Sequence, residues 1–311
     1  MGEPLVSIVI PTWNGAKTLK RVLPALLSQK TAFSFEVIIV DSESKDGTAD
    51  LVQKFSSIRY FRIRKRDFNH GATRQWAAEQ GKGEFIVFLT QDATPASESW
   101  LSSLVNVFDL DSSIVGAYSR QVPYSDCPPL EAERILEWYG AQRKIQYLNG
   151  VQWEELSPME RRLCANFDDV SSCIRKKILL EFPYRPMPYA EELDWAKRVL
   201  QAGKKLAYEP ASIVQHSHRR SCLYEFKRRY IDHKMNRAFY DIHFFPHWPD
   251  AQRAIIAEVK QIYQKTPILS LLERIPVAMA QVLGMYLGAR SIHYKDPLVL
   301  TPLERWFLRG V

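Results

Sequence analysis

The chain has 311 residues, 46% of them hydrophobic, which is enough for one large or two smaller domains with an apolar core. Its formal net charge of +7 favours an anionic partner, such as a nucleotide diphosphate, a nucleic acid or an anionic membrane surface. Four cysteines without a CxxC pair argue against a zinc site or a disulfide framework and favour a reducing compartment.

The first 90 residues alternate between apolar runs and helical patterns. Four runs have the length and composition of buried strands: residues 5–10, 35–40, 58–63 and 85–89. Apolar residues at helical spacing predict three intervening helices: 17–29, 49–55 and 72–80. This alternation is typical of a parallel sheet with crossover helices, so we predict an α/β fold. Because GxGxxG and GxxxxGK[ST] are both absent, a dinucleotide-binding dehydrogenase or a P-loop enzyme is not expected.

The central strand over 85–89 ends at a polar segment with one carboxylate, Asp92. Ligands of open α/β sheets bind beyond the carboxyl ends of the strands, where a carboxylate can hold a divalent cation against a diphosphate. Taken alone, the same residues also fit an aspartate that initiates a turn.

Two other polar residues near strand ends suit a nucleotide. The Asp41 carboxylate can accept a hydrogen bond from the ring N–H of uracil or thymine, a donor that adenine lacks. The Arg74 guanidinium can pair with phosphate oxygens. A turn-capping aspartate and an ordinary surface arginine are the alternatives.

Four motifs, in this order, resemble those of family 2 glycosyltransferases with the GT-A fold: Pro11-Thr12-Trp13-Asn14, Val40-Asp41-Ser42, Gly71-Ala72-Thr73-Arg74 and Thr90-Gln91-Asp92-Ala93. The resemblance spans about the first 220 residues and implies a mostly parallel central sheet flanked by helices. We therefore expect a catalytic domain over 1–220 and a helical C-terminal region over 221–311. The resemblance also implies a nucleotide-sugar site formed by Pro11, Thr12, Asn14, Asp41, Arg74, Gln91 and Asp92.

The metal motif departs from the family, which usually has two or three acids there, whereas this chain has only Asp92. A further ligand for Mg²⁺ or Mn²⁺ is therefore needed. Two histidines with alternate spacing can present one imidazole to a metal. The resemblance favours His216 as this ligand, with His218 as the substitute and with Arg219 and Arg220 as candidates for the diphosphate.

A pair of acids, Glu191 and Glu192, begins a predicted helix. Acids in a first turn are favourable to the helix dipole, which alone could explain them. The resemblance matches them to the family's Glu-Asp motif and implies that Glu192 is the catalytic base, one methylene longer than the usual aspartate. It also places Asp168 and Asp169 on a strand that faces the donor sugar and the acceptor, where one of them could bind sugar hydroxyls.

The Thr-Gln-Asp-Ala sequence is similar to that of bacterial rhamnosyltransferases of surface polysaccharide synthesis. This resemblance implies an inverting, metal-dependent transfer of rhamnose from dTDP-rhamnose to a lipid-linked glycan. The alternatives are a UDP-hexose donor, or a non-catalytic protein that binds glycans or membranes on the same fold.

The remaining segments are less distinctive. Residues 119–163, which include Trp138, Tyr139, Tyr147 and Trp153, predict a helical excursion with aromatic platforms for sugars, or simple packing. Two short extended pieces are expected over 205–208 and 212–214.

The C-terminal region combines charge with apolar surface. Basic and aromatic residues alternate over 223–240, which favours an anionic membrane surface over nucleic acid because no nucleic-acid motif accompanies them. Residues 275–289 are apolar, but the adjoining sequence is too interrupted to reach the roughly 18 residues of a membrane span. Because no export or acylation signal opens the chain, we expect a cytoplasmic protein peripheral to the inner face of the membrane, or a homodimer through this region.

Overall fold

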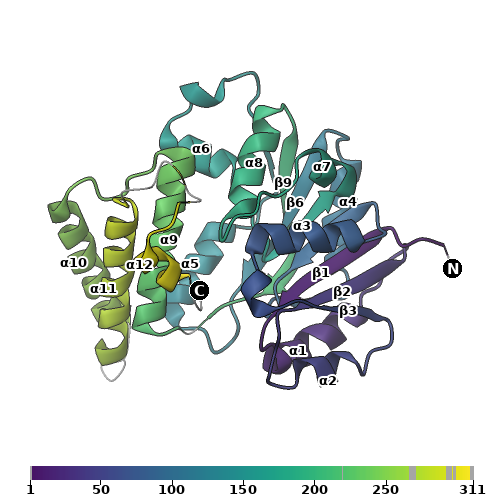
Figure 1. The fold of residues 1–311 in the computed structure, drawn as a ribbon. Helices are drawn as coiled ribbons and strands as arrows, with labels where there is room; N and C mark the ends of the chain where they lie inside the picture. Colours follow the sequence, from purple (N-terminus) through teal and green to yellow (C-terminus); the bar gives the residue numbers. More distant parts are fainter. Residues whose placement is uncertain (1, 219, 266–270, 292–295, 297–298, 309–311) are drawn as a thin grey trace. The chain divides into compact units, whose positions relative to one another are not determined.

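The computed structural model describes residues 2–218, 220–265, 271–291, 296 and 299–308 (Figure 1). The chain forms two compact units, each described here by itself. The first contains residues 1–125, 135–153 and 164–217, and the second contains 126–134, 154–163 and 218–311.

The first unit is built on one mixed sheet. Its strands in the described residues are β1 Val6–Thr12, β2 Phe35–Asp41, β3 Ile58–Arg62, β4 Phe85–Leu89, β5 Thr94–Pro95, β6 Ile114–Val122, β7 Lys144–Gln146, β8 Ser171–Arg175 and β9 Lys205–Gln215. Their order is β3-β2-β1-β4-β8-β6-β9-β5, and β7 also pairs with β9. The part β3-β2-β1-β4 is parallel, as the alternating pattern predicts. Beyond it, β8 runs antiparallel to both β4 and β6, so the sheet is mixed there.

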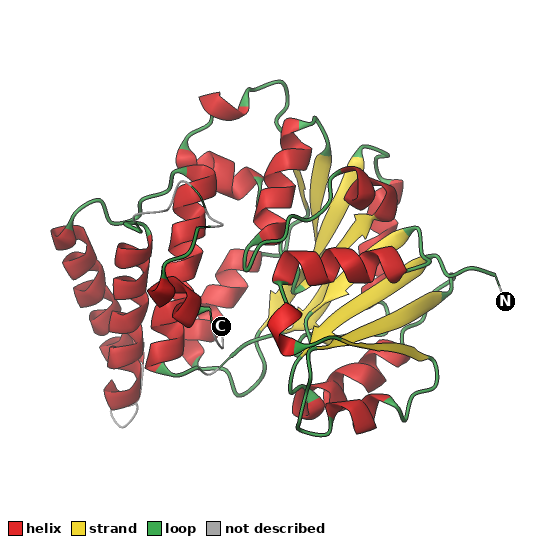
Figure 2. Ribbon diagram, in the orientation of Figure 1, coloured by secondary structure: helices red, strands yellow, loops and turns green. Residues whose placement is uncertain are grey.

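Helices cover both faces of this sheet (Figure 2). Those wholly in the first unit are α1 Ala16–Leu27, α2 Thr48–Val52, α3 His70–Gln80, α4 Trp100–Asn106, α7 Lys176–Glu181 and α8 Glu191–Gln201. Alternate strand residues such as Ile8 and Ile39 join one apolar cluster with Leu23 of α1 and Leu104 of α4. Since α3 packs on β1 and β2 outside that cluster, it covers the opposite face.

One prediction for this unit is wrong. The two short extended pieces expected after α8 are a single strand, β9, interrupted by an irregularity. Its pairing with β6 jumps from Ser119 opposite Glu209 to Arg120 opposite Ile213. Pro210 lies in the residues that the jump leaves over, and because proline has no N–H to donate to the ladder, it is tolerated at such a bulge. The break in the sequence pattern is therefore real, but the strand continues past it.

The second unit is helical in the described residues. Its helices are α9 Cys222–Tyr240, α10 Trp248–Lys265, α11 Leu271–Gly288 and α12 Pro302–Phe307, while α5 Pro129–Tyr139 and α6 Pro158–Cys164 contain residues of both units. Glycines allow α11 and α9 to approach closely. A Cβ on Gly284 would lie 2.5 Å from the Phe226 carbonyl oxygen, and one on Gly288 would lie 2.1 Å from that of Tyr230. Among the described helices, none is both long and apolar enough to span a bilayer.

The basic helix α9 directs part of its charge inward. Lys227 and Lys234 are buried. The Lys234 ammonium donates to the Val299 carbonyl oxygen at 2.7 Å and lies 3.0 Å from a Glu304 carboxylate oxygen. Glu304 caps α12 together with Thr301, so this ion pair fastens α12 to α9.

We predict that Lys234→Met lowers the free energy of unfolding by about 3 to 5 kcal/mol, because it leaves a buried carboxylate without its cation. Burial raises the pKa of Glu304, but hydrogen bonds from Ser291 and Thr301 and the Lys234 charge outweigh it and lower this pKa to about 2. A lowered carboxyl pKa stabilises the fold above the ordinary glutamate value of about 4.3, and this stabilisation is lost as the pH falls toward 2.

Urea unfolding followed by circular dichroism checks both statements. The matched control is Lys265→Met, which removes the exposed ion pair with Glu133 and should change stability by less than about 1 kcal/mol. If the two variants lost the same free energy of unfolding, the buried Lys234–Glu304 pair would not be what fastens α12 to α9.

Candidate active site

The loops after β1 and β4 are joined by one side chain. The Gln91 amide accepts from the Trp13 N–H at 3.0 Å and donates to the Trp13 carbonyl oxygen at 3.1 Å. Gly15 lies close to this link, since a Cβ there would be 2.5 Å from Gln91 Oε1 and would displace the Gln91 side chain. Gln91 therefore holds the two loops in place, and its predicted contact with the nucleotide-sugar remains a prediction.

The predicted nucleotide residues of the first loop are tied to the loop after β2. Pro11 and Thr12 are the last residues of β1, and the Thr12 carbonyl oxygen accepts from the Ser42 N–H. Asn14 has φ 47°, a left-handed conformation that asparagine tolerates better than most residues. Its side-chain oxygen accepts from the Lys45 N–H at 2.9 Å. These contacts shape the edge of the sheet on which a nucleotide is expected.

Asp41 is buried at the end of β2. One carboxylate oxygen accepts from the Ser44 N–H at 3.0 Å, and the other accepts from the Tyr60 hydroxyl at 2.5 Å. Burial and this carboxylate both raise the pKa of Tyr60. The turn-capping alternative is thus present in the structure, and recognition of the base by Asp41 remains a prediction.

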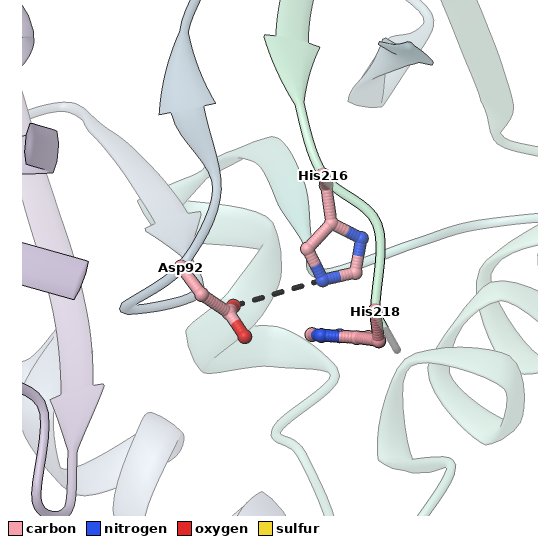
Figure 3. Close-up of side chains that lie close together, drawn as sticks. All are labelled: Asp92, His216 and His218. Carbon is pink, nitrogen blue, oxygen red and sulfur yellow. Dashed lines mark ion pairs between the residues drawn. The ribbon is translucent and has the colours of Figure 1, made fainter. Parts of the chain in front are cut away.

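The structure brings together the predicted metal ligands. His216 Nε2 lies 3.6 Å from Asp92 Oδ1 (Figure 3). The His216 N–H continues the sheet by donating to the Val122 carbonyl oxygen at 2.9 Å, which fixes the backbone beneath the imidazole. His218, two residues further on, offers a third ligand atom, and the three atoms lie within 4.8 Å of one another. A set of one carboxylate and one or two imidazoles suits Mn²⁺ better than Mg²⁺, which prefers oxygen ligands.

Arg74 is not the surface arginine that was the alternative to a phosphate contact. It is 7% exposed and pairs with carboxylates of the protein. Its guanidinium donates to Glu191 at 2.6 Å and lies 3.5 Å from Asp169. The partners are 117 and 95 residues away in the sequence, so no local pattern could indicate them. Phosphate binding by Arg74 remains a prediction.

Three carboxylates surround this single guanidinium. Asp169, Glu191 and Glu192 each offer an oxygen within 4.8 Å of the others. Burial raises the pKa of all three, and for Glu192 the neighbouring charges of Glu191 and Asp169 raise it further, well above its ordinary value. The cluster therefore retains a proton at pH values where an exposed glutamic acid has lost it. A carboxylate with such proton affinity is suited to remove a proton from a hydroxyl.

Close packing fixes the start of α8 at this cluster. Ala190, which precedes Glu191, has φ 62°, a conformation that costs a non-glycine residue on the order of 1 kcal/mol and is frequent at functional sites. Gly71 of α3 lies against the same segment, because a Cβ there would be 1.9 Å from the Arg185 carbonyl oxygen. Helix α3 and the strained turn thus hold the two glutamates together.

The other predicted residues have separate surroundings. Asp168 accepts hydrogen bonds from Gln121, Tyr139 and the Val170 N–H, so its contacts differ from those of Asp169. Arg220 lies over the Tyr224 ring and within 3.1 Å of His218 Nδ1. Arg219 lies outside the described residues. Sugar or diphosphate binding by these residues remains a prediction.

Aromatic residues of the middle segment divide into two kinds. Tyr139 and Trp153 are buried, whereas Trp138 and Tyr147 are more than 40% exposed. No sequence pattern singles out Lys65, whose ammonium lies 3.3 Å from the centre of the Trp13 ring beside the first loop. A basic residue in the short helical turn between β3 and α3 carries no pattern that could have identified it.

Two solved structures show a similar fold. A mannosyltransferase from Pyrobaculum calidifontis in complex with GDP-Man and Mn²⁺ superposes with a TM-score of 0.52 and 15% identity, over 100% of this chain and 80% of that one. Residues 1–349 of TarS from S. aureus in complex with UDP superpose with a TM-score of 0.53 and 16% identity, over 92% of this chain and 90% of that one. The predicted α/β fold of the GT-A class is therefore confirmed.

Sequence comparison identifies the family. Residues 7–180 match the model for glycosyl transferase family 2. The chain is 32% identical over 231 residues to the O-antigen chain rhamnosyltransferase RfbN of Salmonella typhimurium, which covers 73% of this chain and 70% of that protein. It is 28% identical over 234 residues to WbaN of Salmonella anatum, another O-antigen chain rhamnosyltransferase, over 74% and 71% of the two chains. The chain belongs to glycosyl transferase family 2 and is a glycosyltransferase similar to rhamnosyltransferases.

We predict that Arg74→Met lowers the free energy of unfolding by about 3 to 5 kcal/mol, since the buried carboxylates of Asp169 and Glu191 lose their shared cation. Urea unfolding measures the loss. The control is Arg59→Met, which removes a partly exposed pair with Glu36 and should cost about 1 kcal/mol or less. A stable Arg74→Met protein with weakened nucleotide binding would contradict the structural role and favour a phosphate contact.

Proposed function

We propose that the protein is an inverting, metal-dependent rhamnosyltransferase that transfers L-rhamnose from dTDP-rhamnose to a lipid-linked glycan. One observation carries the proposal: the Asp92–His216 pair and the carboxylate cluster belong to the same edge of the sheet. The Thr90 N–H donates to the Val170 carbonyl oxygen at 3.1 Å, which places the residues after β4 beside those before β8. A donor held by the Asp92–His216 pair would therefore lie at the edge of the sheet to which the carboxylate cluster contributes Asp169.

The donor is chosen on two grounds. The relatives RfbN and WbaN are named O-antigen chain rhamnosyltransferases, which favours rhamnose. The Asp41 carboxylate suits a pyrimidine with a ring N–H, a feature of both dTDP and UDP. A UDP-hexose donor is therefore the second candidate, supported by the complex of TarS with UDP-GlcNAc.

Transfer proceeds by a single displacement. The acceptor hydroxyl oxygen attacks C1 of rhamnose on the face opposite the diphosphate, the bond between C1 and the diphosphate oxygen breaks, and dTDP departs with that electron pair. Glu192 accepts the hydroxyl proton, and its high proton affinity follows from burial beside Glu191 and Asp169. Asp92 and His216 would hold the cation, which when bound stabilises the charge of the departing diphosphate.

A lipid-linked acceptor requires access to a membrane surface. The second unit exposes large apolar side chains on several of its helices: Leu223, Trp248, Ile256, Tyr263, Leu272 and Leu287. Exposed apolar residues together with the basic helix α9 suit peripheral contact with anionic lipid.

We predict that dTDP-rhamnose with Mn²⁺ raises the melting temperature more than UDP-glucose or UDP-GlcNAc does, because a ligand stabilises the state that binds it. Thermal shift of the full chain, with and without Mn²⁺, measures this. In His216→Ala the increment due to Mn²⁺ should disappear. A larger shift with a UDP-sugar would replace rhamnose by that sugar, and a full shift without any cation would contradict metal dependence.

We predict that Glu192→Gln lowers the rate of transfer by about 10²- to 10⁴-fold and leaves the affinity for dTDP-rhamnose unchanged. In the parent enzyme kcat/KM should rise with pH, because the base acts only when deprotonated, and the rise should lie above the ordinary range of a glutamate. The matched control is Glu79→Gln on the exposed side of α3. Full activity in Glu192→Gln would assign the base to another residue.

A further inference from the structure

We propose that Gln121, oriented by Asp168, is a positioning residue that sets the tautomer of His216 and thereby makes Nε2 the metal-binding nitrogen. The inference rests on the proposed metal site and extends it to two residues that do not touch the cation. Gln121 lies on β6 and is 6% exposed. Gln121 lies next to the end of β9, because it is paired with Val214 and the following residue, Val122, is paired with Gln215.

The Gln121 amide connects two groups of different chemistry. Its Nε2 donates to Asp168 Oδ2 at 2.5 Å, and its Oε1 lies 2.8 Å from His216 Nδ1. Asp168 also accepts from the Val170 N–H at 2.9 Å and from the Tyr139 hydroxyl. The four side chains Tyr139, Asp168, Gln121 and His216 therefore form one continuous hydrogen-bonded network that ends at the imidazole.

The Asp168 carboxylate determines the orientation of the Gln121 amide. An ionised carboxylate only accepts hydrogen bonds, so the amide must turn its NH₂ group toward Asp168. Its oxygen, which is an acceptor, must then face His216. The orientation follows from the chemistry of Asp168, even though oxygen and nitrogen of an amide have nearly the same shape.

The amide in turn decides the imidazole tautomer. Because Gln121 Oε1 accepts, His216 Nδ1 carries the hydrogen, and the lone pair is on Nε2. Nε2 is the atom that lies 3.6 Å from Asp92 Oδ1. Two electron-pair donors that face each other at this distance suit a shared cation. Hydrogen bonds to the far nitrogen commonly orient metal-binding histidines, and their loss costs about 10- to 100-fold in metal affinity.

The variant Asp168→Asn tests the relay without touching the proposed ligands. The Val170 N–H needs an acceptor, so the new amide keeps its oxygen there and turns its NH₂ group toward Gln121. Gln121 then flips and donates to His216 Nδ1, which moves the imidazole hydrogen to Nε2. We expect ¹⁵N–¹H long-range spectra of the metal-free protein to show Nδ1–H in the parent and Nε2–H in the variant. We expect the dissociation constant for Mn²⁺, measured by titration calorimetry, to rise about 10- to 100-fold.

Two further variants make the result decisive. In Gln121→Met, the new side chain has a similar shape but no hydrogen-bond acceptor. His216 should then be a mixture of tautomers, and Mn²⁺ binding should be weaker. This variant also serves as the test if Asp168→Asn does not fold. Asp111→Asn, in the turn before β6 and far along the strand from Gln121, should change neither the tautomer of His216 nor the affinity for Mn²⁺.

An Nδ1–H tautomer and unchanged Mn²⁺ affinity in both Asp168→Asn and Gln121→Met would overturn the proposal. A failure of the proposed metal site can be distinguished from a failure of this inference. If His216 does not bind the metal, His216→Ala will leave the affinity for Mn²⁺ unchanged. The tautomer spectra need no metal and would still decide the role of Gln121.

Discussion

The antiparallel pairing of β4 with β8 is the constraint on which the site depends. It sets Leu89 opposite Ser171, and a further hydrogen bond joins Thr90 to Val170 just beyond the paired strands. The turn that carries Asp92 therefore lies beside the segment that carries two consecutive aspartates. A shift of this register by one residue would reverse which side chains point to each face of the sheet, and would separate the two groups.

The two aspartates before β8 serve different networks. Asp168 reaches through Gln121 to the imidazole at the proposed metal site, whereas Asp169 belongs to the buried cluster around Arg74. Neighbouring residues thus belong to the network at the proposed metal site and to the cluster that contains the proposed base. The high proton affinity of the cluster arises from burial of three carboxylates with one guanidinium, so the same contacts that stabilise the fold also prepare the proposed base.

The sequence was sufficient for the elements whose signals are local. The apolar run over 85–89 is strand β4 to the residue, and the glutamate pair does begin α8. Contacts between residues far apart in the sequence could not be predicted from local patterns. The partners of Arg74 are about a hundred residues away, and Gln121 belongs to no recognisable motif. The inward-facing Lys234 looked like surface charge because its partner, Glu304, follows it by 70 residues. Motifs of the family located the edge of the sheet, but the contacts within it required coordinates.

A crystal structure with dTDP and Mn²⁺, solved with anomalous data at the manganese absorption edge, tests the central claim most directly. The account predicts one manganese peak bonded to an Asp92 oxygen, to His216 Nε2 and to the diphosphate. Manganese among Asp169, Glu191 and Glu192 instead, or dTDP bound at this edge with no ordered cation, would contradict it.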